Sequence, residues 1–281
     1  MDQQAIQHFR AEVIARKNLP TIPTVLAKIL ELSESVDANG KDLIAVVEKD
    51  QALTGKMLRL ANSAFFGQNR RVATIWRAVL LLGFGTVRNL ALGVKVWDAL
   101  STGVPRERAE GLWAHAVGVA GAAKTLAGKL RSGDPDEAFT AGLLHDVGRL
   151  VLAMRFKDDY WTVTKGVAER EPVDALERAA FGVDHAEVGG WLLEAWALPA
   201  PIVEQVRSHH ANATRPAAMT AVGLADRLVA WTDLATGETT PEATAILEAI
   251  AAKGVTAEVW AGVVAQMRDG GGIAALTGLG S

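Results

Sequence analysis

Apolar residues along this chain recur at spacings of three and four, which is the periodicity of amphipathic helices. Near the start, Ile22, Val25, Leu26, Ile29 and Leu30 fall on one helical face. Runs in which apolar and polar residues alternate over the length of a strand are scarce. The pattern therefore predicts an all-α fold. We expect helices over residues 3–17, 22–35, 40–49, 51–65, 74–83, 85–100, 107–131, 135–156, 158–170, 172–181, 185–197, 200–210, 216–235, 241–253 and 257–268.

Start and stop signals divide the chain into segments. The run 134–137, Asp-Pro-Asp-Glu, combines an N-cap aspartate, a proline at the first helical position and a glutamate at the third. The run 101–105, Ser-Thr-Gly-Val-Pro, is the best internal boundary, because glycine and proline interrupt helices. We therefore predict two parts, an N-terminal helical subdomain over residues 1–103 and a helical bundle over residues 104–281.

The composition limits the chemistry and the location of the protein. Its 281 residues carry a net charge of -3, so nothing favours a nucleic-acid partner. The absence of cysteine excludes disulfides, thiolate metal ligands and cysteine nucleophiles. The N-terminal segment lacks the apolar core of a secretion signal, and apolar runs such as residues 78–84 are too short to cross a bilayer. We expect a cytoplasmic protein without a membrane segment.

The adjacent residues His145 and Asp146 lie in an apolar, helix-like segment, residues 143–149. An ionised carboxylate is costly to bury unless it has a counter-ion, hydrogen bonds or a metal. Neighbours on a helix point about 100° apart, so both side chains reach one site only at the rim of the buried face. Histidine and carboxylate are the ligands that a chain without cysteine offers to a divalent transition metal. The other candidates are His115, His185, His209, His210 and Asp226.

Spacing alone leaves open a second interpretation, in which these residues only stabilise a helical core. In that case His209 and His210 are cations that interact with the end of a helix. His185 is then an ordinary residue of a first turn, and Asp226 pairs with Arg227 or another basic residue.

A resemblance to a known family bears on this choice. The ordered set of histidines and aspartates resembles the signature of the HD superfamily of metal-dependent phosphohydrolases. The N-terminal half is similar to the HDOD domain, the HD-related output domain of bacterial signalling proteins. The resemblance covers about residues 19–235. The runs that carry it are residues 19–23 (LPTIP), 47–67, 75–83 (IWRAVLLLG), 88–92, 181–189 (FGVDHAEVG) and 198–199.

The resemblance implies an all-α fold in which an N-terminal helical subdomain packs on an HD-like bundle. It also implies a mostly non-catalytic role in bacterial signalling and regulation, through a protein partner or a small signalling ligand. Although many members have lost ligands, every ligand position of the superfamily is occupied here, which leaves open the binding of a divalent ion (Fe, Mn, Mg or Zn) and residual hydrolysis. The implied ligands are His115, His145, Asp146, His185, His210 and Asp226, with Arg149 and His209 as possible contacts to a ligand or phosphate.

The alternative is a metal-dependent phosphohydrolase that acts on a nucleotide or a cyclic dinucleotide. Against it, Arg149 stands where the related cyclic-di-GMP phosphodiesterases carry lysine. The loop 211–216 also lacks their Gly-Tyr-Pro element.

Charged and polar residues also interrupt the N-terminal half. Asp50, Thr54, Lys56 and Arg59 lie within an apolar helical segment that ends near Asn62. Buried groups of this kind need partners, so we expect an interhelical hydrogen-bond network here in preference to a ligand site.

Overall fold

The computed structural model describes residues 2–15, 23–34, 40–62, 66, 71–165 and 173–269. Within this part of the chain the only strand-like pairing is an isolated bridge between Thr232 and Thr239, which confirms the all-α prediction. In chain order the helices are α1 (Gln3–Ile14), α2 (Thr24–Glu34), α3 (Gly40–Glu48), α4 (Gln51–Ala61), α5 (Ile75–Leu82), α6 (Phe84–Ser101), α7 (Arg106–Leu130), α8 (Pro135–Leu144), α9 (Val147–Phe156), α10 (Asp158–Thr164), α11 (Val173–Phe181), α12 (His185–Ala195), α13 (Ala200–Ser208), the short 3-10 helix η3 (Pro216–Ala218), α14 (Ala221–Ala230), α15 (Pro241–Ile250), the 3-10 helix η4 (Ala251–Lys253) and α16 (Ala257–Asp269).

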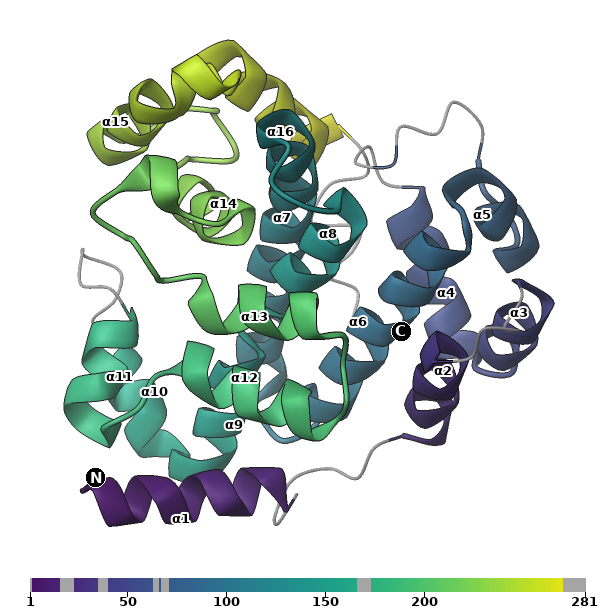
Figure 1. Ribbon diagram of the computed structural model, residues 1–281, viewed down its shortest axis with the longest axis horizontal. Coiled ribbons are helices and arrows are strands. Elements are labelled where there is room, and N and C mark those ends of the chain that lie inside the picture. The colour runs from purple at the N-terminus through teal and green to yellow at the C-terminus, as the bar shows by residue number, and fades with distance from the viewer. Residues whose placement is uncertain are drawn as a thin grey trace.

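The helices form two groups that share α6 (Figure 1). Helices α2 to α5 pack around one side of α6, and α8 packs against its other side. Helix α7 is the centre of the second group and contacts both α8 and α14. The first helix of the chain crosses to this second group: Phe9 of α1 makes edge-to-face ring contacts with Phe156 and Trp191. The predicted division of the chain into two parts at residue 103 stays a prediction. Helix α1 precedes this boundary in the sequence but packs on α12, which follows it.

Among the described residues, two predicted helices differ from the structure by more than a shift of a few residues at their ends; the predicted helical residues 16–17, 22, 35, 63–65, 166–170 and 172 lie outside the described residues. The predicted helix over residues 135–156 is wrong as a single element, because it ends at Leu144 and a new helix begins at Val147. Asp146 between them has φ -96° and ψ 5°, outside the helical region. The predicted helix over residues 216–235 is shorter, since Thr220 caps α14 by accepting a hydrogen bond from the Gly223 N–H.

The polar residues of the N-terminal half form the expected interhelical network. Asp50 caps α4 through the Leu53 N–H and also pairs with Lys95 of α6 at 2.8 Å. Lys56 of α4 pairs with Asp98 of α6. These contacts confirm the interhelical network for Asp50 and Lys56, and the Thr54 hydroxyl donates to the Val47 carbonyl at 3.0 Å. Arg59 is exposed instead, so the expectation that it is a buried member of the network is wrong.

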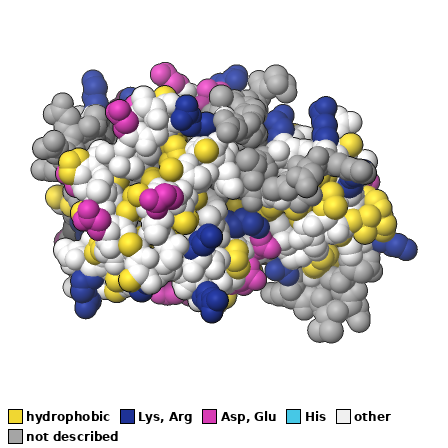
Figure 2. Space-filling view, turned by 90° about the horizontal axis from the view of Figure 1, so that it is seen from above, with side chains coloured by type: hydrophobic (Ala, Val, Ile, Leu, Met, Phe, Trp, Pro, Cys, Tyr) yellow, Lys and Arg dark blue, Asp and Glu magenta, His cyan; other side chains and the backbone are white. Residues whose placement is uncertain are grey.

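The outer surface shows mixed charge. Figure 2 shows Lys and Arg side chains interspersed with Asp and Glu over the described residues of one face. None of the described helices combines the length and the apolar character needed to cross a bilayer.

Candidate metal centre

The break between α8 and α9 places His145 and Asp146 at the centre of the second helix group. His145 is fully buried and Asp146 is 3% exposed. Because the chain leaves the helical path at this point, the two side chains are not restricted to the 100° separation of a continuous helix. The expected placement at the rim of a helix is therefore corrected: both side chains start from a joint between two helices.

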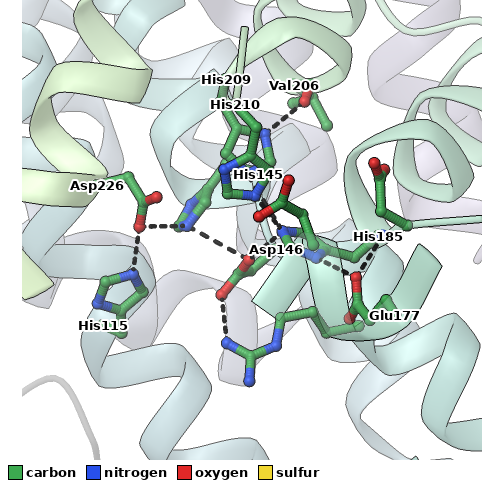
Figure 3. Close-up of polar contacts among 12 residues, drawn as sticks. His115, His145, Asp146, Glu177, His185, Val206, His209, His210 and Asp226 are labelled. Atoms are coloured by element: carbon green, nitrogen blue, oxygen red, sulfur yellow. Dashed lines mark hydrogen bonds and ion pairs between the residues drawn. The ribbon is translucent and has the colours of Figure 1, made fainter. Parts of the chain in front are cut away.

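The other candidates come to this joint from four elements (Figure 3). His115 lies in the middle of α7, His185 begins α12, His209 and His210 follow α13, and Asp226 lies on α14. The structure thus brings all six predicted ligands together, and His209 lies beside them. Their ligand atoms form three overlapping groups, each with all members within 4.8 Å: His185, His209 and His210; His115, His145 and Asp146; and His145, His209 and Asp226.

Distances within the centre are those of polar contacts. His115 Nε2 lies 2.9 Å from Asp226 Oδ1, and His145 Nε2 lies 3.5 Å from the same oxygen. His185 Nε2 lies 3.2 Å from Asp146 Oδ1. Asp226 therefore pairs with histidines. Arg227, its expected alternative partner, lies over the ring of Trp231.

Hydrogen bonds on the outer side of the rings fix the tautomers. His145 Nδ1 donates to the Gly142 carbonyl at 2.7 Å, and His209 Nδ1 donates to the Val206 carbonyl at 2.6 Å. Since a carbonyl oxygen only accepts, each Nδ1 carries a proton, and each Nε2 faces the centre as the atom that binds either a second proton or a metal ion. His185 Nδ1 likewise donates to a carboxylate, that of Glu177, at 2.5 Å.

The Nε2 atoms of these rings converge on one another. His185 Nε2 and His209 Nε2 are 3.2 Å apart, and His210 Nε2 is 2.9 Å from His185 Nε2. His145 Nε2 is buried and makes no hydrogen bond. Buried polar atoms normally find a partner, so this arrangement calls for a cation between the rings.

The electrostatic balance points the same way. Burial favours neutral His185, but the charge of Glu177 outweighs it and raises the pKa to about 9. Burial likewise opposes a charge on His145, yet Asp146 and Asp226 raise its pKa. Burial also disfavours ionised Asp146, but the charges of His145 and Arg149 hold its pKa well below the usual range. The centre therefore stabilises positive charge, either as protons or as a metal ion.

The remaining histidines are not stabilising cations at a helix end. Burial, together with the positive charges of His145 and His185, lowers the pKa of His209 to about 3. Burial and the adjacent His209 and His185 also lower the pKa of His210 well below its usual value. Both rings are therefore neutral and offer lone pairs, as metal-ligating imidazoles do.

The residues present fit a divalent transition metal. Imidazole nitrogens and carboxylate oxygens from separate helices are its usual ligands in a helical bundle. His145 Nε2, which is buried and makes no hydrogen bond although Asp146 Oδ1 and Asp226 Oδ1 each lie 3.5 Å away, is the atom that such an ion would most directly satisfy. A bound ion would supply positive charge and Lewis acidity at this point.

Glycines allow the helices that carry the ligands to approach closely. A Cβ on Gly148 would lie 1.9 Å from the carbonyl oxygen of His185, and a Cβ on Gly223 would lie 2.2 Å from that of His209. Both distances are far below van der Waals contact, so no side chain fits. Each glycine thus sets the position of a histidine on another element.

Arg149 occupies a different place from the one expected of a phosphate contact. Its Nη1 donates to Asp146 Oδ2 at 3.0 Å, and its Nε donates to the hydroxyl of Tyr160 at 3.2 Å. The guanidinium is therefore bound behind Asp146.

Sequence reasoning missed Glu177 and Tyr160. Both are fully buried, and the Tyr160 hydroxyl donates to Glu177 Oε1 at 2.8 Å. One signal was available for Glu177: it shares a helical face with the apolar residues Val173 and Phe181, four positions away on either side. A charge on an apolar face requires a partner.

Comparison with known proteins agrees with the geometry. The model of the HDOD domain matches residues 19–212. The chain belongs to the HDOD domain family. This HDOD chain is also 32% identical over 197 residues to an uncharacterized protein of Treponema pallidum; the match covers 69% of the chain and spans only 38% of the length of that relative.

Solved structures share the fold of this HDOD chain. A crystal structure of a protein of Shewanella amazonensis, provisionally named a phosphohydrolase, is 26% identical with a TM-score of 0.71, covering 95% of this chain and 98% of that one. An HDOD domain protein of unknown function from Geobacter sulfurreducens is 25% identical with a TM-score of 0.71, covering 97% of this chain and 99% of that one.

Proposed function

We propose that this chain is a regulatory HDOD protein of bacterial signalling that holds a divalent metal ion at the His/Asp centre. The observation that supports metal binding is the convergence of imidazole Nε2 atoms on two carboxylates, above all that of His145 Nε2, which is buried without a hydrogen bond. The ligands are His115, His145, Asp146, His185, His210 and Asp226, with His209 beside them. Fe, Mn, Mg and Zn are the candidate ions, and imidazole-rich ligation favours the transition metals.

A structural or sensing role suits the position of the ion. Its ligands come from α7, the α8–α9 joint, α12, the end of α13 and α14, so binding would tie five elements together. An ion that binds only the folded state stabilises that state by linkage. The protein would act on a signalling protein partner or respond to a small signalling ligand in the cytoplasm.

Two observations support regulation over hydrolysis. Arg149 is held by Asp146 and Tyr160, so its charge is not directed at a bound phosphate. His145, His185 and His209 are at most 2% exposed, which restricts the approach of a substrate to the ion.

The second candidate is a metal-dependent phosphohydrolase acting on a nucleotide or a cyclic dinucleotide. The complete set of ligands favours it, and so does the name of the Shewanella amazonensis relative. In this case the centre would hold an ion that supplies Lewis acidity for hydrolysis, and a substrate would reach it most readily beside His115 and Asp226, whose side chains are 25% and 16% exposed.

Elemental analysis of the full chain purified without chelator tests the metal. We expect about one or more ions per chain in the wild type and none in the His145→Ala/Asp146→Ala variant. Wild-type protein without metal would contradict the proposal.

A nucleotide panel then separates the two functions. With Mn²⁺, Fe²⁺ or Mg²⁺ bound, the regulatory function predicts no turnover and the hydrolase predicts release of a phosphate or linear product. In cells, folded His145→Ala protein should keep its signalling role. Loss of that role with the fold intact would favour the hydrolase.

A further inference from the structure

Behind the metal centre, five residues form a closed ring of polar contacts. Arg149 Nη1 donates to Asp146 Oδ2, and Arg149 Nε donates to the Tyr160 hydroxyl. That hydroxyl donates to Glu177 Oε1, and His185 Nδ1 donates to Glu177 Oε2. His185 Nε2 closes the ring 3.2 Å from Asp146 Oδ1 (Figure 3). The ring therefore begins and ends on two predicted metal ligands.

Glu177 fixes the ring of His185 by two contacts to one oxygen. Its Oε2 accepts the backbone N–H of His185 at 2.8 Å and the Nδ1–H at 2.5 Å. A carboxylate that accepts the Nδ1 proton leaves Nε2 as the ligand atom and increases its basicity. Glu177 thus decides both the tautomer and the direction of the His185 lone pair.

Arg149 does the same for the carboxylate of Asp146. It binds Oδ2, so Oδ1 is the oxygen that faces His145 Nε2 at 3.5 Å and His185 Nε2 at 3.2 Å. The charge of Arg149 also offsets the burial of a second carboxylate, Glu177, close to Asp146.

Tyr160 links these two halves. Its hydroxyl accepts from Arg149 and donates to Glu177, which uses both of its hydrogen-bonding functions in the interior. Tyr160 lies on α10 and Glu177 on α11, two helices that supply none of the predicted ligands. The side chains of Tyr160 and Glu177 thereby connect this pair of helices to the centre.

We propose that Arg149, Tyr160 and Glu177 are positioning residues that hold Asp146 and His185 in the geometry for metal binding. This inference rests on the proposed metal site, and it assigns α10 and α11 the role of supporting that site. Partners of this kind typically change metal affinity by about 10- to 100-fold when they are removed.

The test compares zinc affinity in full-length wild type, Glu177→Gln and Tyr160→Phe by competition with a chromophoric chelator. Glu177→Gln should weaken zinc binding by about 10- to 100-fold, and Tyr160→Phe should weaken it by about 10-fold. A matched control is Thr232→Val, which removes a buried hydroxyl that accepts from Trp260 Nε1 at 3.1 Å and donates to the Leu228 carbonyl at 2.6 Å. The control should lose stability but keep wild-type zinc affinity.

A spectroscopic readout does not depend on the metal. The Nδ1 proton of His185 should resonate far downfield in wild-type protein, because its bond to a carboxylate is short, and this signal should move upfield in Glu177→Gln. Wild-type zinc affinity in both folded variants would overturn the positioning role and leave the proposed function intact. A wild type that binds no zinc or other divalent ion would overturn the proposed function, and the positioning role with it.

Discussion

Two regions of this protein bury charged side chains, and they do so in opposite ways. In the N-terminal half, each carboxylate of the network between α4 and α6 has its own ammonium: Asp50 pairs with Lys95, and Asp98 with Lys56. At the His/Asp centre, Asp146 and Glu177 share one fixed cation, Arg149, and the partners of Asp226 are the rings of His115 and His145. Charges that are matched in pairs need no further partner, whereas an excess of carboxylates and imidazole nitrogens requires a ligand.

The largest expected effect concerns removal of the metal. Chelation of zinc-loaded protein should lower the free energy of unfolding by about 3 to 4 kcal/mol, for free zinc at about 100 to 1,000 times the dissociation constant. Thermal unfolding with and without EDTA measures this. Asp50→Asn, in the matched region, should show the same EDTA effect as wild type. The His145→Ala/Asp146→Ala variant should show none, and a full effect there would place the ion elsewhere.

Gly148→Ala should come next. The added methyl meets the His185 carbonyl oxygen at 1.9 Å and the Gly189 nitrogen at 2.7 Å, so α9 and α12 must separate. We expect a loss of about 3 kcal/mol in urea unfolding and weaker metal binding. Gly111→Ala is the control: its Cβ meets nothing within 4 Å, and it should stabilise α7 by about 0.5 to 1 kcal/mol. Equal effects of the two substitutions would refute the packing argument.

A smaller effect is expected when the matched charges are removed. Asp98→Ala leaves Lys56 without its partner and should cost about 1 to 2 kcal/mol. The double variant Lys56→Met/Asp98→Leu should lie within about 1 kcal/mol of wild type, because apolar residues can replace a pair. Denaturant unfolding of both variants measures this, and metal content should not change in either. A double variant worse than the single one would show that the pair does more than balance charge.

The smallest effect is a pH dependence at Asp50. Burial opposes its ionisation, but the Leu53 N–H and Lys95 outweigh burial and lower its pKa. A depressed folded pKa contributes stability above the unfolded value, about 3.9, and this contribution is lost as the pH falls through the folded pKa. Asp50→Asn keeps a capping side chain, so its deficit should be largest near pH 6 and shrink toward pH 3. A deficit that is constant over urea titrations in this range would contradict the assignment.

Much of the fold was predictable because its signals are local. Asp134 caps α8 by accepting from the backbone of Asp136 and Glu137, with Pro135 at the first helical position, as its sequence indicates. The break at His145 and Asp146 was not predictable, because apolar residues continue in helical phase on both sides of it. What allows the break is tertiary: Gly148 lies against the backbone of α12.

The centre itself divides in the same way. Its ligands were predictable as a set because their order along the chain resembles a family signature. Glu177 and Tyr160 were not found, because their importance lies in contacts between α9, α10, α11 and α12 that periodicity does not describe. The sequence singled out Arg149 but did not predict that its guanidinium points to Asp146 and Tyr160, since the direction of a side chain depends on which partner lies nearest.

The position of α1 has a practical consequence for dissecting the protein. Helix α1 packs on the second helix group, α2 to α5 form the first group, and the chain after α6 belongs to the second group again. A single cut in the chain therefore does not separate the two groups cleanly. A fragment that starts at residue 19, where the family match begins, would lack Phe9 and would expose the rings of Phe156 and Trp191 on which it packs. A cleaner deletion would instead remove α2 to α5 and join α1 directly to the chain that follows them.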